Sequence, residues 1–289
     1  MNILVADSGS TKTDWVYIHN NEVESRWKTS GINPMMQTTN SIIATLQSDY
    51  SQWSEYEVDV IYFYGAGCIG GEANLVVSQA LLSLYGGTPR VEVATDLLGA
   101  ARALFGNKPG VACILGTGAN SGLYDGNKLT YNVPPLGFIL GDEGSGAHIG
   151  KRLVADCLKG LVSEDLTQKL YTWSGLTYRQ FIENVYRKPF PNRFLARFAE
   201  FAKENIDMPE VQVIVEEAFN SFVERNLLQY EGIEHLQIGF VGSVAVSFEQ
   251  QIRNVLRRHF DSDIVFVTSP IDGLVKNIID RDESYNRVE

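Results

Sequence analysis

The chain has few cysteines and histidines and no long apolar run, and each absence excludes a class of protein. Its three cysteines stand far apart and form no CxxC pair, and its four histidines form no HExxH pair, so the sequence offers no local zinc site. No apolar run approaches the roughly 20 residues that span a bilayer, and the amino terminus lacks the pattern of a signal peptide. We therefore expect reduced, mostly buried thiols and a cytoplasmic protein that does not enter a membrane.

The chain also has fewer basic than acidic residues. The chain has 24 Lys and Arg residues against 35 Asp and Glu residues, which gives a formal net charge of −11. A surface of that sign disfavours binding to nucleic acid or to an anionic membrane. It does not exclude a nucleotide, because backbone amides and Mg²⁺ can hold phosphate groups. A length of 289 residues with 44% hydrophobic residues suits a globular protein of roughly two domains.

Apolar runs and turn signals follow the same order in both halves of the chain. In the first half, the pattern predicts strands at about 2–7, 13–19, 22–29, 58–64 and 91–94, and helices at about 39–49, 72–85 and 96–105. In the second half, it predicts strands at about 111–115, 121–124, 128–133, 235–241 and 264–267, and helices at about 145–160, 209–230, 244–260 and 271–281. Each half therefore reads as three antiparallel strands, helix, strand, helix, strand, helix, which predicts an α/β fold with two mixed five-stranded sheets.

This repetition divides the chain into two expected domains. Residues 1–107 would form the first, and residues 108–289 the second, with a helical insertion near 161–208. The last helix is expected to pack back on the first domain. Two such sheets facing each other would leave a cleft between strand ends and turns, where ligands of open α/β sheets usually bind.

The segment Asp7 to Asp14 joins two predicted strands through a polar turn. A turn of small residues lets backbone N–H groups approach phosphate oxygens closely, and hydroxyl and lysine side chains add donors. The candidate phosphate-binding residues of this turn are Ser8, Gly9, Ser10, Thr11, Lys12 and Thr13. Asp7 could hold Mg²⁺ directly or through water. The turn fits half of a triphosphate site, and an ordinary polar hairpin turn is the alternative.

Two commoner phosphate motifs do not fit. A Walker loop requires a second glycine where Thr11 stands and a helix after Lys12-Thr13, but a strand pattern follows. A dinucleotide fingerprint requires a third glycine where Ser121 stands, and the segment from Gly116 to Gly122 leads into a strand instead of a helix. The chain therefore has neither of these nucleotide-binding motifs.

Four segments, taken in order, resemble the superfamily of sugar kinases, Hsp70 and actin. Within it they are similar to the N-acetylglucosamine kinase branch, which is grouped with the BadF/BadG/BcrA/BcrD-type ATPases. Asp7 to Asp14 resembles the first phosphate loop, and Ile114 to Ser121 resembles the second. Gly137 to Gly146 resembles the branch's Gly-Trp-x-x-Gly-Asp-Glu-Gly-Ser box, with Phe138 in place of the tryptophan, and Gly239 to Ala245 resembles the adenosine segment. The resemblance implies two ribonuclease H-like, actin-like ATPase domains facing across a cleft.

The resemblance also implies roles for residues outside the first loop. Asp96, at a strand end, would be the catalytic base, because phosphoryl transfer to an alcohol needs a carboxylate that accepts its proton; a plain helix N-cap is the alternative. ATP would further contact Gly116, Thr117, Gly118, Gly242 and Ser243. The sugar would contact Asn33, Asp96, Thr117, Asn120, Gly137, Phe138 and Asp142. For Asp142, an acidic residue at a helix N-terminus is the alternative.

The expected activity is ATP-dependent and Mg²⁺-dependent phosphorylation of an amino-sugar hydroxyl. N-acetylglucosamine, converted to its 6-phosphate, is the first choice of substrate, and N-acetylmuramic acid, glucosamine and N-acetylmannosamine stay open. The resemblance further suggests a homodimer. One alternative is an ATPase that activates a dehydratase or reductase through a cysteine-bound [4Fe–4S] cluster, for which Cys68, Cys113 and Cys157 lack local pairing. The other is a non-catalytic sugar or nucleotide sensor, against which the presence of Asp7, Asp96 and Asp142 argues.

Overall fold

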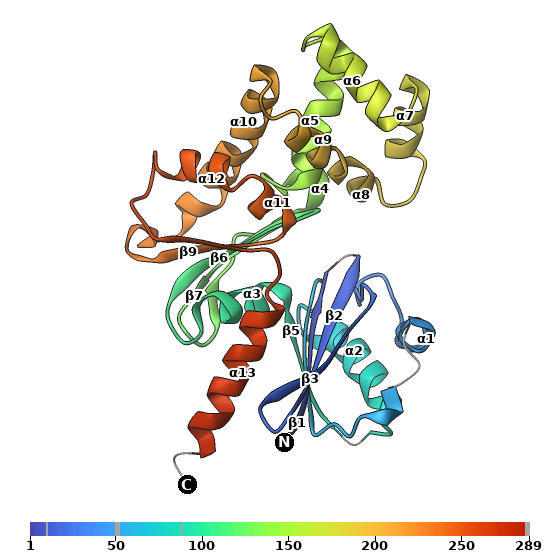
Figure 1. Cartoon of the computed structure of the whole chain (residues 1–289), viewed down its shortest axis with the longest axis vertical. Coiled ribbons are helices and arrows are strands. Elements are labelled where there is room, and N and C mark those ends of the chain that lie inside the picture. Colours follow the sequence, from blue (N-terminus) through green and yellow to red (C-terminus); the bar gives the residue numbers. More distant parts are fainter. Residues whose placement is uncertain (10, 50–52, 88, 287–289) are drawn as a thin grey trace. The chain divides into compact units, whose positions relative to one another are not determined.

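The computed structural model describes residues 1–9, 11–49, 53–87 and 89–286, and the chain divides into two compact units. Unit 1 comprises Met1–Lys108, Asp125–Lys128 and Ser269–Glu289, and unit 2 comprises Pro109–Tyr124 and Leu129–Thr268. Each unit contains a mixed five-stranded sheet covered by helices (Figure 1). The predicted α/β class with two mixed five-stranded sheets is therefore confirmed.

The sheet of unit 1 has the strand order β3-β2-β1-β4-β5. Its strands are β1 (Asn2–Ser8), β2 (Lys12–His19), β3 (Glu22–Ser30), β4 (Val60–Gly65) and β5 (Arg90–Thr95). β1, β2 and β3 form an antiparallel meander, whereas β1, β4 and β5 run parallel. The carboxyl ends of β1, β3, β4 and β5 and the start of β2 consequently lie at the same end of the sheet.

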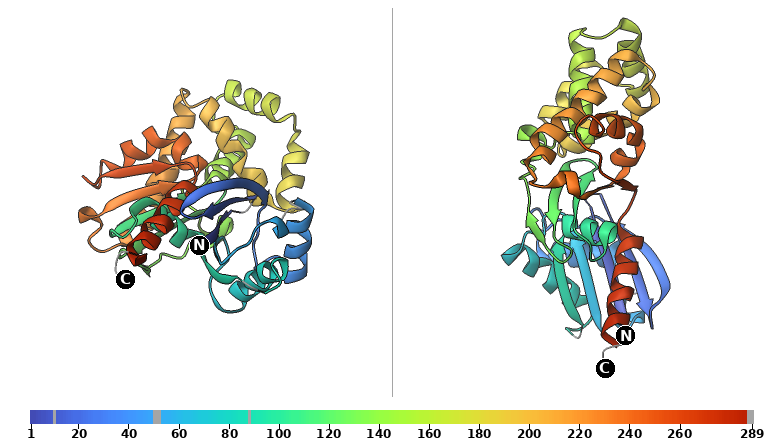
Figure 2. Two further views of the ribbon diagram at one scale, coloured as in Figure 1. Left: turned by 60° about the horizontal axis from the view of Figure 1, so that its bottom comes forward. Right: turned by 90° about the vertical axis from the view of Figure 1, so that its left-hand side faces the viewer.

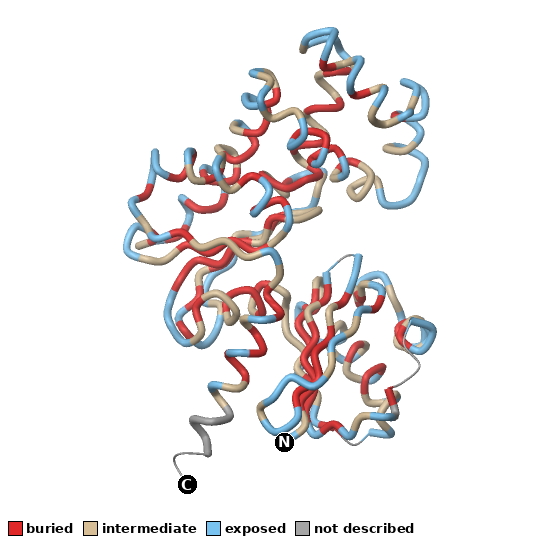
Figure 3. Tube along the Cα trace, viewed as in Figure 1, coloured by how far each residue is buried: buried red, intermediate tan, exposed pale blue. Residues whose placement is uncertain are grey.

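Alternation along β1 buries both faces of this sheet. Leu4 and Ala6 pack in one cluster with α1 (Thr39–Asp49) and α2 (Gly71–Leu84), and Ile3 and Val5 pack in another with α13 (Ile271–Asn286). Figure 1 shows α1 and α2 on one side of the unit 1 sheet and α13 on the other. The buried positions in Figure 3 follow the central strands for the same reason.

The remaining helix of unit 1 is α3 (Asp96–Phe105), which packs against α13. A short 3₁₀ helix, Trp53–Glu55, precedes β4. Because α13 contacts α3, β1 and β2, the last helix of the chain belongs to the core of unit 1.

The sheet of unit 2 has the strand order β10-β9-β6-β7-β8. Its strands are β6 (Gly110–Leu115), β7 (Ala119–Tyr124), β8 (Leu129–Tyr131), β9 (Gln237–Val241) and β10 (Ile264–Val267). β6, β9 and β10 run parallel, and β7 and β8 continue antiparallel from β6. The turns after β6 and β9 therefore lie at the same end of this sheet.

Helices make up the rest of unit 2. They are α4 (Gly137–Leu140), α5 (Gly146–Lys159), α6 (Glu164–Ser174), α7 (Tyr178–Tyr186), α8 (Pro191–Ala196), α9 (Phe198–Glu204), α10 (Pro209–Arg225), α11 (Ser243–Ser247) and α12 (Glu249–Leu256), with 3₁₀ helices Leu227–Gln229 and Ile233–His235. The expected insertion forms α6 to α9, which gather at one end of unit 2 around α5 (Figure 2). No helix among the described residues is both long and apolar enough to cross a bilayer.

Two helices predicted in unit 2 differ from the structure. The helix expected at 244–260 is broken into α11 and α12 at Phe248, which is 1% exposed and packs its ring against Phe219. The helix expected at 209–230 ends at Arg225 and continues as a 3₁₀ turn. In both places the helical pattern continues in the sequence, but burial of a side chain or a tighter turn overrides local propensity.

Candidate active site

Two buried hydroxyl groups, those of Ser8 and Thr13, fix the turn after β1 by hydrogen bonds. Ser8 and Thr13 are both 0% exposed, and their hydroxyl oxygens lie 2.8 Å apart. The N–H of Ile32 donates to Ser8 Oγ at 3.0 Å, and Thr13 Oγ1 donates to the main-chain oxygen of Ser30 at 3.1 Å. These hydroxyls therefore fix the turn to the end of β3, and Thr11 and Lys12 are its exposed side chains. Ser10, also expected to bind phosphate, lies outside the described residues.

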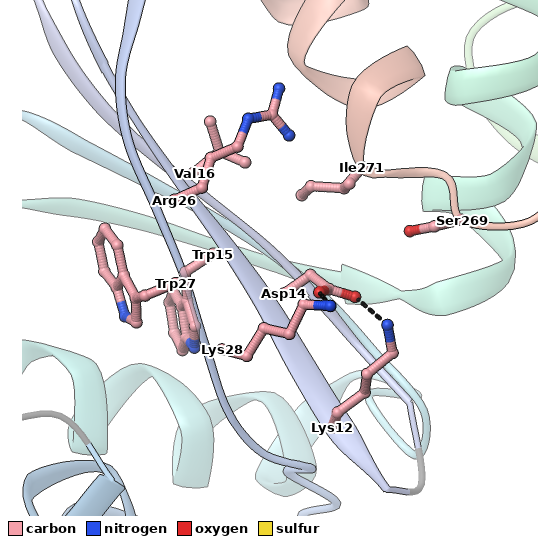
Figure 4. Close-up of a pocket in the computed structure, with 9 residues that line it drawn as sticks. All are labelled: Lys12, Asp14, Trp15, Val16, Arg26, Trp27, Lys28, Ser269 and Ile271. Atoms are coloured by element: carbon pink, nitrogen blue, oxygen red, sulfur yellow. Dashed lines mark ion pairs between the residues drawn. The ribbon is translucent and has the colours of Figure 1, made fainter.

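Lys12 pairs with an acidic side chain of the same strand. Its Nζ lies 2.8 Å from Asp14 Oδ2, and Lys28 Nζ lies 3.5 Å from Asp14 Oδ1 (Figure 4). These side chains line a groove that Arg26 and Ile271, at the start of α13, complete. The side chain of Lys12 is 55% exposed, so solvent screens the pair and a phosphate oxygen could replace Asp14.

Asp7 and Asp96 form the acidic centre of unit 1. Burial raises the pKa of Asp7 from 3.8 to about 7, and the negative charges of Asp96 and Asp14 add to that rise. Burial also raises the pKa of Asp96 from 3.8 to about 6, opposed by the N–H of Leu97, which donates to Asp96 Oδ1 at 2.8 Å. Both carboxyl groups stand at the carboxyl end of the parallel strands, where their negative charge attracts a cation or a proton.

Asp96 does not cap its helix. Thr95 is the N-cap of α3, and its side-chain oxygen accepts the N–H of Leu98 at 3.1 Å. Asp96 is the first residue of the helix itself. The alternative explanation of Asp96 as an N-cap is therefore wrong, and the residue is left with a partly buried carboxyl group of raised pKa.

The carboxylates of unit 1 could coordinate Mg²⁺ only together with the phosphates of a bound nucleotide. No group of three or more His, Cys, Asp or Glu side chains within the described ranges could hold a metal ion. Mg²⁺ usually takes one or two carboxylates together with water and substrate phosphates. Asp7, whose raised pKa reflects burial near two other carboxylates, fits that pattern as a single ligand.

Asn33 lies in the loop after β3 and is held in one orientation. Its Oδ1 accepts the N–H of Met35 at 3.0 Å, and its own N–H donates to Gln37 Oε1 at 2.7 Å. The side chain sits against Gly67, where an added Cβ would lie only 2.4 Å from Asn33 Oδ1. The side-chain NH₂ group of Asn33 is consequently the part left for a ligand.

In unit 2, the second candidate phosphate hairpin is anchored on the first turn of α5. The N–H of Gly116 donates to the oxygen of Gly118 at 2.9 Å, closing the turn. The oxygens of Gly116 and Thr117 accept the N–H groups of Gly146 at 2.8 Å and Ala147 at 3.1 Å. Because those amides belong to a helix N-terminus, the main chain of the hairpin is fixed to the start of α5.

Asp142 joins this hairpin to the Gly-Asp-Glu-Gly-Ser box. Its Oδ1 accepts the N–H of Ala119 at 3.2 Å, and a Cβ on Gly118 would lie 3.0 Å from its Oδ2. Its φ of 54° is in the left-handed region, which a non-glycine residue adopts at a cost. α5 has no acidic residue in its first turn and is capped by Ser145. The alternative explanation of Asp142 as a helix-terminal acid is therefore wrong, and burial raises its pKa.

The segment expected to form the sugar platform is a short helix, α4. Phe138 is half-buried, and its main-chain oxygen accepts a hydrogen bond from Lys151 Nζ at 3.2 Å. Gly137 is exposed at the start of the helix with a φ of 73°. The sequence pattern did not predict this helix, and the sugar-binding role of both residues stays a prediction.

Gly242 occupies a position that no other residue could fill without displacement. Its φ is 122°, and a Cβ there would lie 2.3 Å from the oxygen of Leu115. Its N–H donates to the oxygen of Val267 at 3.0 Å, and Ser243 begins α11 directly after it. The strand ends of β6, β9 and β10 therefore meet at this glycine, while its contact with adenosine stays a prediction.

Sequence reasoning missed Asn132, whose side chain donates to Asn120 Oδ1 at 2.9 Å. The hairpin predicted at Asp125-Gly126 could have indicated that Asn132 lies near Asn120. Because that turn pairs β7 with β8, with Leu123 opposite Tyr131, it places Asn132 beside the middle of β7, two residues along the strand from Asn120.

Comparison with known proteins shows that the chain is similar to solved structures. No protein-family model matches the chain, and no curated protein matches it. A proposed N-acetylglucosamine kinase from Porphyromonas gingivalis is 42% identical with a TM-score of 0.91, over 96% of this chain and 99% of the other. A second such protein, from Chromobacterium violaceum, is 16% identical with a TM-score of 0.71, over 96% and 98%. A ROK family glucokinase from Streptomyces griseus, in complex with glucose and AMPPNP, is 15% identical with a TM-score of 0.56, over 96% and 98%. The last two share the fold.

Proposed function

Because this chain belongs to the N-acetylglucosamine kinase family, a branch of the sugar kinase, Hsp70 and actin superfamily, we propose that it transfers the γ-phosphoryl group of ATP to an amino sugar. The acceptor in this proposal is the 6-hydroxyl of N-acetylglucosamine, and the products are the 6-phosphate and ADP. The single observation that carries the proposal is Asp96, a partly buried carboxyl group of raised pKa that its helix does not need as a cap.

Asp96 acts as the base in this reaction. The sugar hydroxyl donates its hydrogen bond to the carboxylate, which orients the oxygen and accepts the proton as the bond to phosphorus forms. A pKa of about 6 leaves the carboxylate ionised at pH 7.5, yet makes it a stronger base than an exposed aspartate. Burial therefore suits Asp96 to proton acceptance near neutral pH.

Each unit carries its own candidate ATP contacts in this proposal. Unit 1 provides the turn Ser8–Thr13, with Lys12 leaving Asp14 to contact a phosphate oxygen. Unit 2 provides the hairpin Gly116–Gly118, and Gly242 with Ser243 contact adenosine. Mg²⁺, when bound with ATP, supplies positive charge that offsets the phosphates, and Asp7 would hold it directly or through water.

The sugar-binding residues divide into donors and acceptors of hydrogen bonds. Asn33 would donate through its NH₂ group, since its Oδ1 already accepts the N–H of Met35, whereas Asp96 and Asp142 would accept. Sugar hydroxyls can do both, so this mixture suits a polyol ring. Gly137, Phe138 and Thr117 would complete the sugar contacts.

The rival activity of a cluster-bearing ATPase is less well supported. Its cluster would require cysteine thiolates, but Cys68, Cys113 and Cys157 are all free and buried. Burial raises the pKa of Cys68 to about 12 and that of Cys157 to about 11, so the thiol forms are favoured. Free thiols are typical of cytosolic proteins, and a cytoplasmic location and a homodimer remain part of our proposal.

The test is ADP formation by the purified protein with MgATP and a panel of sugars: N-acetylglucosamine, N-acetylmannosamine, N-acetylmuramic acid, glucosamine and glucose. We expect sugar-dependent ADP formation that is greatest with N-acetylglucosamine. The Asp96→Asn variant should lose it, and Asp261→Asn, at an exposed position, should keep it. Sugar-independent ADP formation, or none at all, would contradict the proposal.

A further inference from the structure

The side chains of Asn120 and Asn132 meet at the edge of the unit 2 sheet. Asn120 is the second residue of β7, and Asn132 follows β8, the strand paired with it. Asn132 Nδ2 donates to Asn120 Oδ1 at 2.9 Å. An asparagine pair can in principle be turned in four ways, because each amide has an oxygen end and a nitrogen end. The neighbouring backbone decides between them.

Two backbone oxygens fix the amide of Asn132. The same Nδ2 lies within hydrogen-bond distance of the main-chain oxygens of Ser121 and Val133, so its two hydrogens are shared among three acceptor oxygens. Carbonyl oxygens only accept hydrogen bonds, so the NH₂ end must face them, and Asn120 must then turn its oxygen toward that NH₂ group. Turning Asn132 over would place its oxygen against two other oxygens.

A backbone donor fixes the amide of Asn120 independently. The N–H of Ser121 donates to Asn120 Oδ1 at 2.9 Å. Because an N–H group only donates, the oxygen end of Asn120 has to lie on this side whatever Asn132 does. Both lines of evidence give the same orientation, in which Asn120 points its NH₂ group away from Asn132.

Tyr230 holds the backbone that makes these contacts. Its side chain is 2% exposed, its hydroxyl lies 2.8 Å from Ser121 Oγ, and it accepts the N–H of Val133 at 3.2 Å. The two segments whose oxygens fix Asn132 are thus tied to one buried ring. The amide of Asn120 is therefore oriented before any ligand binds, which limits the entropy lost on binding.

The NH₂ group of Asn120 makes no hydrogen bond with any part of the chain that the structure describes. A fixed NH₂ group can pair with a hydroxyl or a carbonyl oxygen, but not with an ammonium group, which only donates. We infer that Asn132 is a positioning residue for Asn120, and that Asn120 donates to the acetamido carbonyl oxygen of the sugar. This inference rests on the proposed function, and it predicts a preference for N-acetylated sugars over free amino sugars.

Steady-state kinetics with N-acetylglucosamine and glucosamine test the inference, with selectivity measured as the ratio of kcat/KM values. Asn120→Asp keeps the shape and keeps an oxygen toward Ser121, but it turns a second oxygen outward. We expect its selectivity to fall by about 100-fold, with KM for N-acetylglucosamine rising and KM for glucosamine falling, because a carboxylate repels a carbonyl oxygen and attracts an ammonium group. Asn132→Ala should raise KM for N-acetylglucosamine about tenfold with little change in kcat, since the amide of Asn120 then loses one of its two anchors.

Two controls keep the outcomes separate. Asn254→Ala, at an exposed position of α12, should leave selectivity unchanged, and thermal melting should show that each variant folds. If the unaltered protein turns over both sugars and Asn120→Asp keeps its selectivity, the inference is overturned while the kinase proposal stands. If the unaltered protein phosphorylates no sugar, both are overturned. A fall in selectivity caused only by a lower kcat would also contradict the inference, because it would indicate a general loss of structure.

Discussion

Replacing Asp96 with asparagine should lower turnover and raise stability together. The substitution removes the base but keeps an oxygen that can accept the N–H of Leu97, which now donates to Asp96 Oδ1 at 2.8 Å. Loss of general base catalysis typically costs about 10²- to 10⁴-fold in rate. ATP binding should persist, because the phosphate hairpins do not depend on this side chain. The opposite sign of the two effects separates a catalytic carboxylate from a structural one.

The expected gain in stability follows from the pKa of Asp96. Folding raises that pKa from 3.8 to about 6, so the folded state binds the proton more tightly than the unfolded state. Each pKa unit corresponds to about 1.4 kcal/mol, so ionising the buried carboxyl group costs about 3 kcal/mol at most, and less where water reaches it. The cost is absent below pH 4, grows as the pH rises to about 6, and is constant above that. Asparagine does not ionise and avoids it.

Chemical denaturation of the original protein and of Asp96→Asn at pH 4, 6 and 8 would measure this cost. The difference in unfolding free energy should be near zero at pH 4 and favour the variant by about 2 to 3 kcal/mol at pH 8. The kcat/KM of the original protein should fall about tenfold per pH unit below pH 6. A variant that is less stable than the original at pH 8, or a turnover that survives the substitution, would refute the role of Asp96.

Three other substitutions test the remaining parts of the site. Asp7→Asn should raise the Mg²⁺ concentration for half-maximal turnover by about tenfold or more, measured by metal titration, and an unchanged requirement would exclude this ligand. Gly67→Ala, whose Cβ would lie 2.4 Å from Asn33 Oδ1, should raise the KM for sugar about tenfold while leaving the KM for ATP unchanged. Gly242→Ala should unfold the protein at lower denaturant concentration than Gly232→Ala, because both glycines have positive φ but only the first has no room for a Cβ. Equal losses at the two glycines would show that backbone strain alone acts there.

Much of the fold could be predicted because its signals are local and periodic. The apolar runs at β1, β4, β6 and β9 marked the central strands, and the repeated pattern gave the order of strands and helices along the chain. The break at Phe248 could not be predicted, because it depends on which ring packs there. What the sequence could not predict was therefore set by tertiary packing and not by secondary-structure propensity.

The candidate site likewise has features that could be predicted from the sequence and features that could not. Asp7, Asp96 and the two glycine turns follow apolar strands, so their positions at one end of each sheet could be predicted from sequence order. The burial of the Ser8 and Thr13 hydroxyls could not be predicted, because Ser8 bonds to Ile32, 24 residues away, and Thr13 bonds to Ser30, 17 residues away. The same holds for the Asp142 contact with Ala119 and for the orientation of Asn120 by Asn132, which depend on pairing between segments.

The most direct test of the central claim is ³¹P NMR of the product formed from MgATP and N-acetylglucosamine. Our account predicts that the protein converts ATP to ADP only when sugar is present, and that a new phosphomonoester signal couples to the two protons on C6. The Asp96→Asn variant should give no such signal in the same time. A signal from inorganic phosphate alone, or a phosphate ester at another carbon of the ring, would contradict the account.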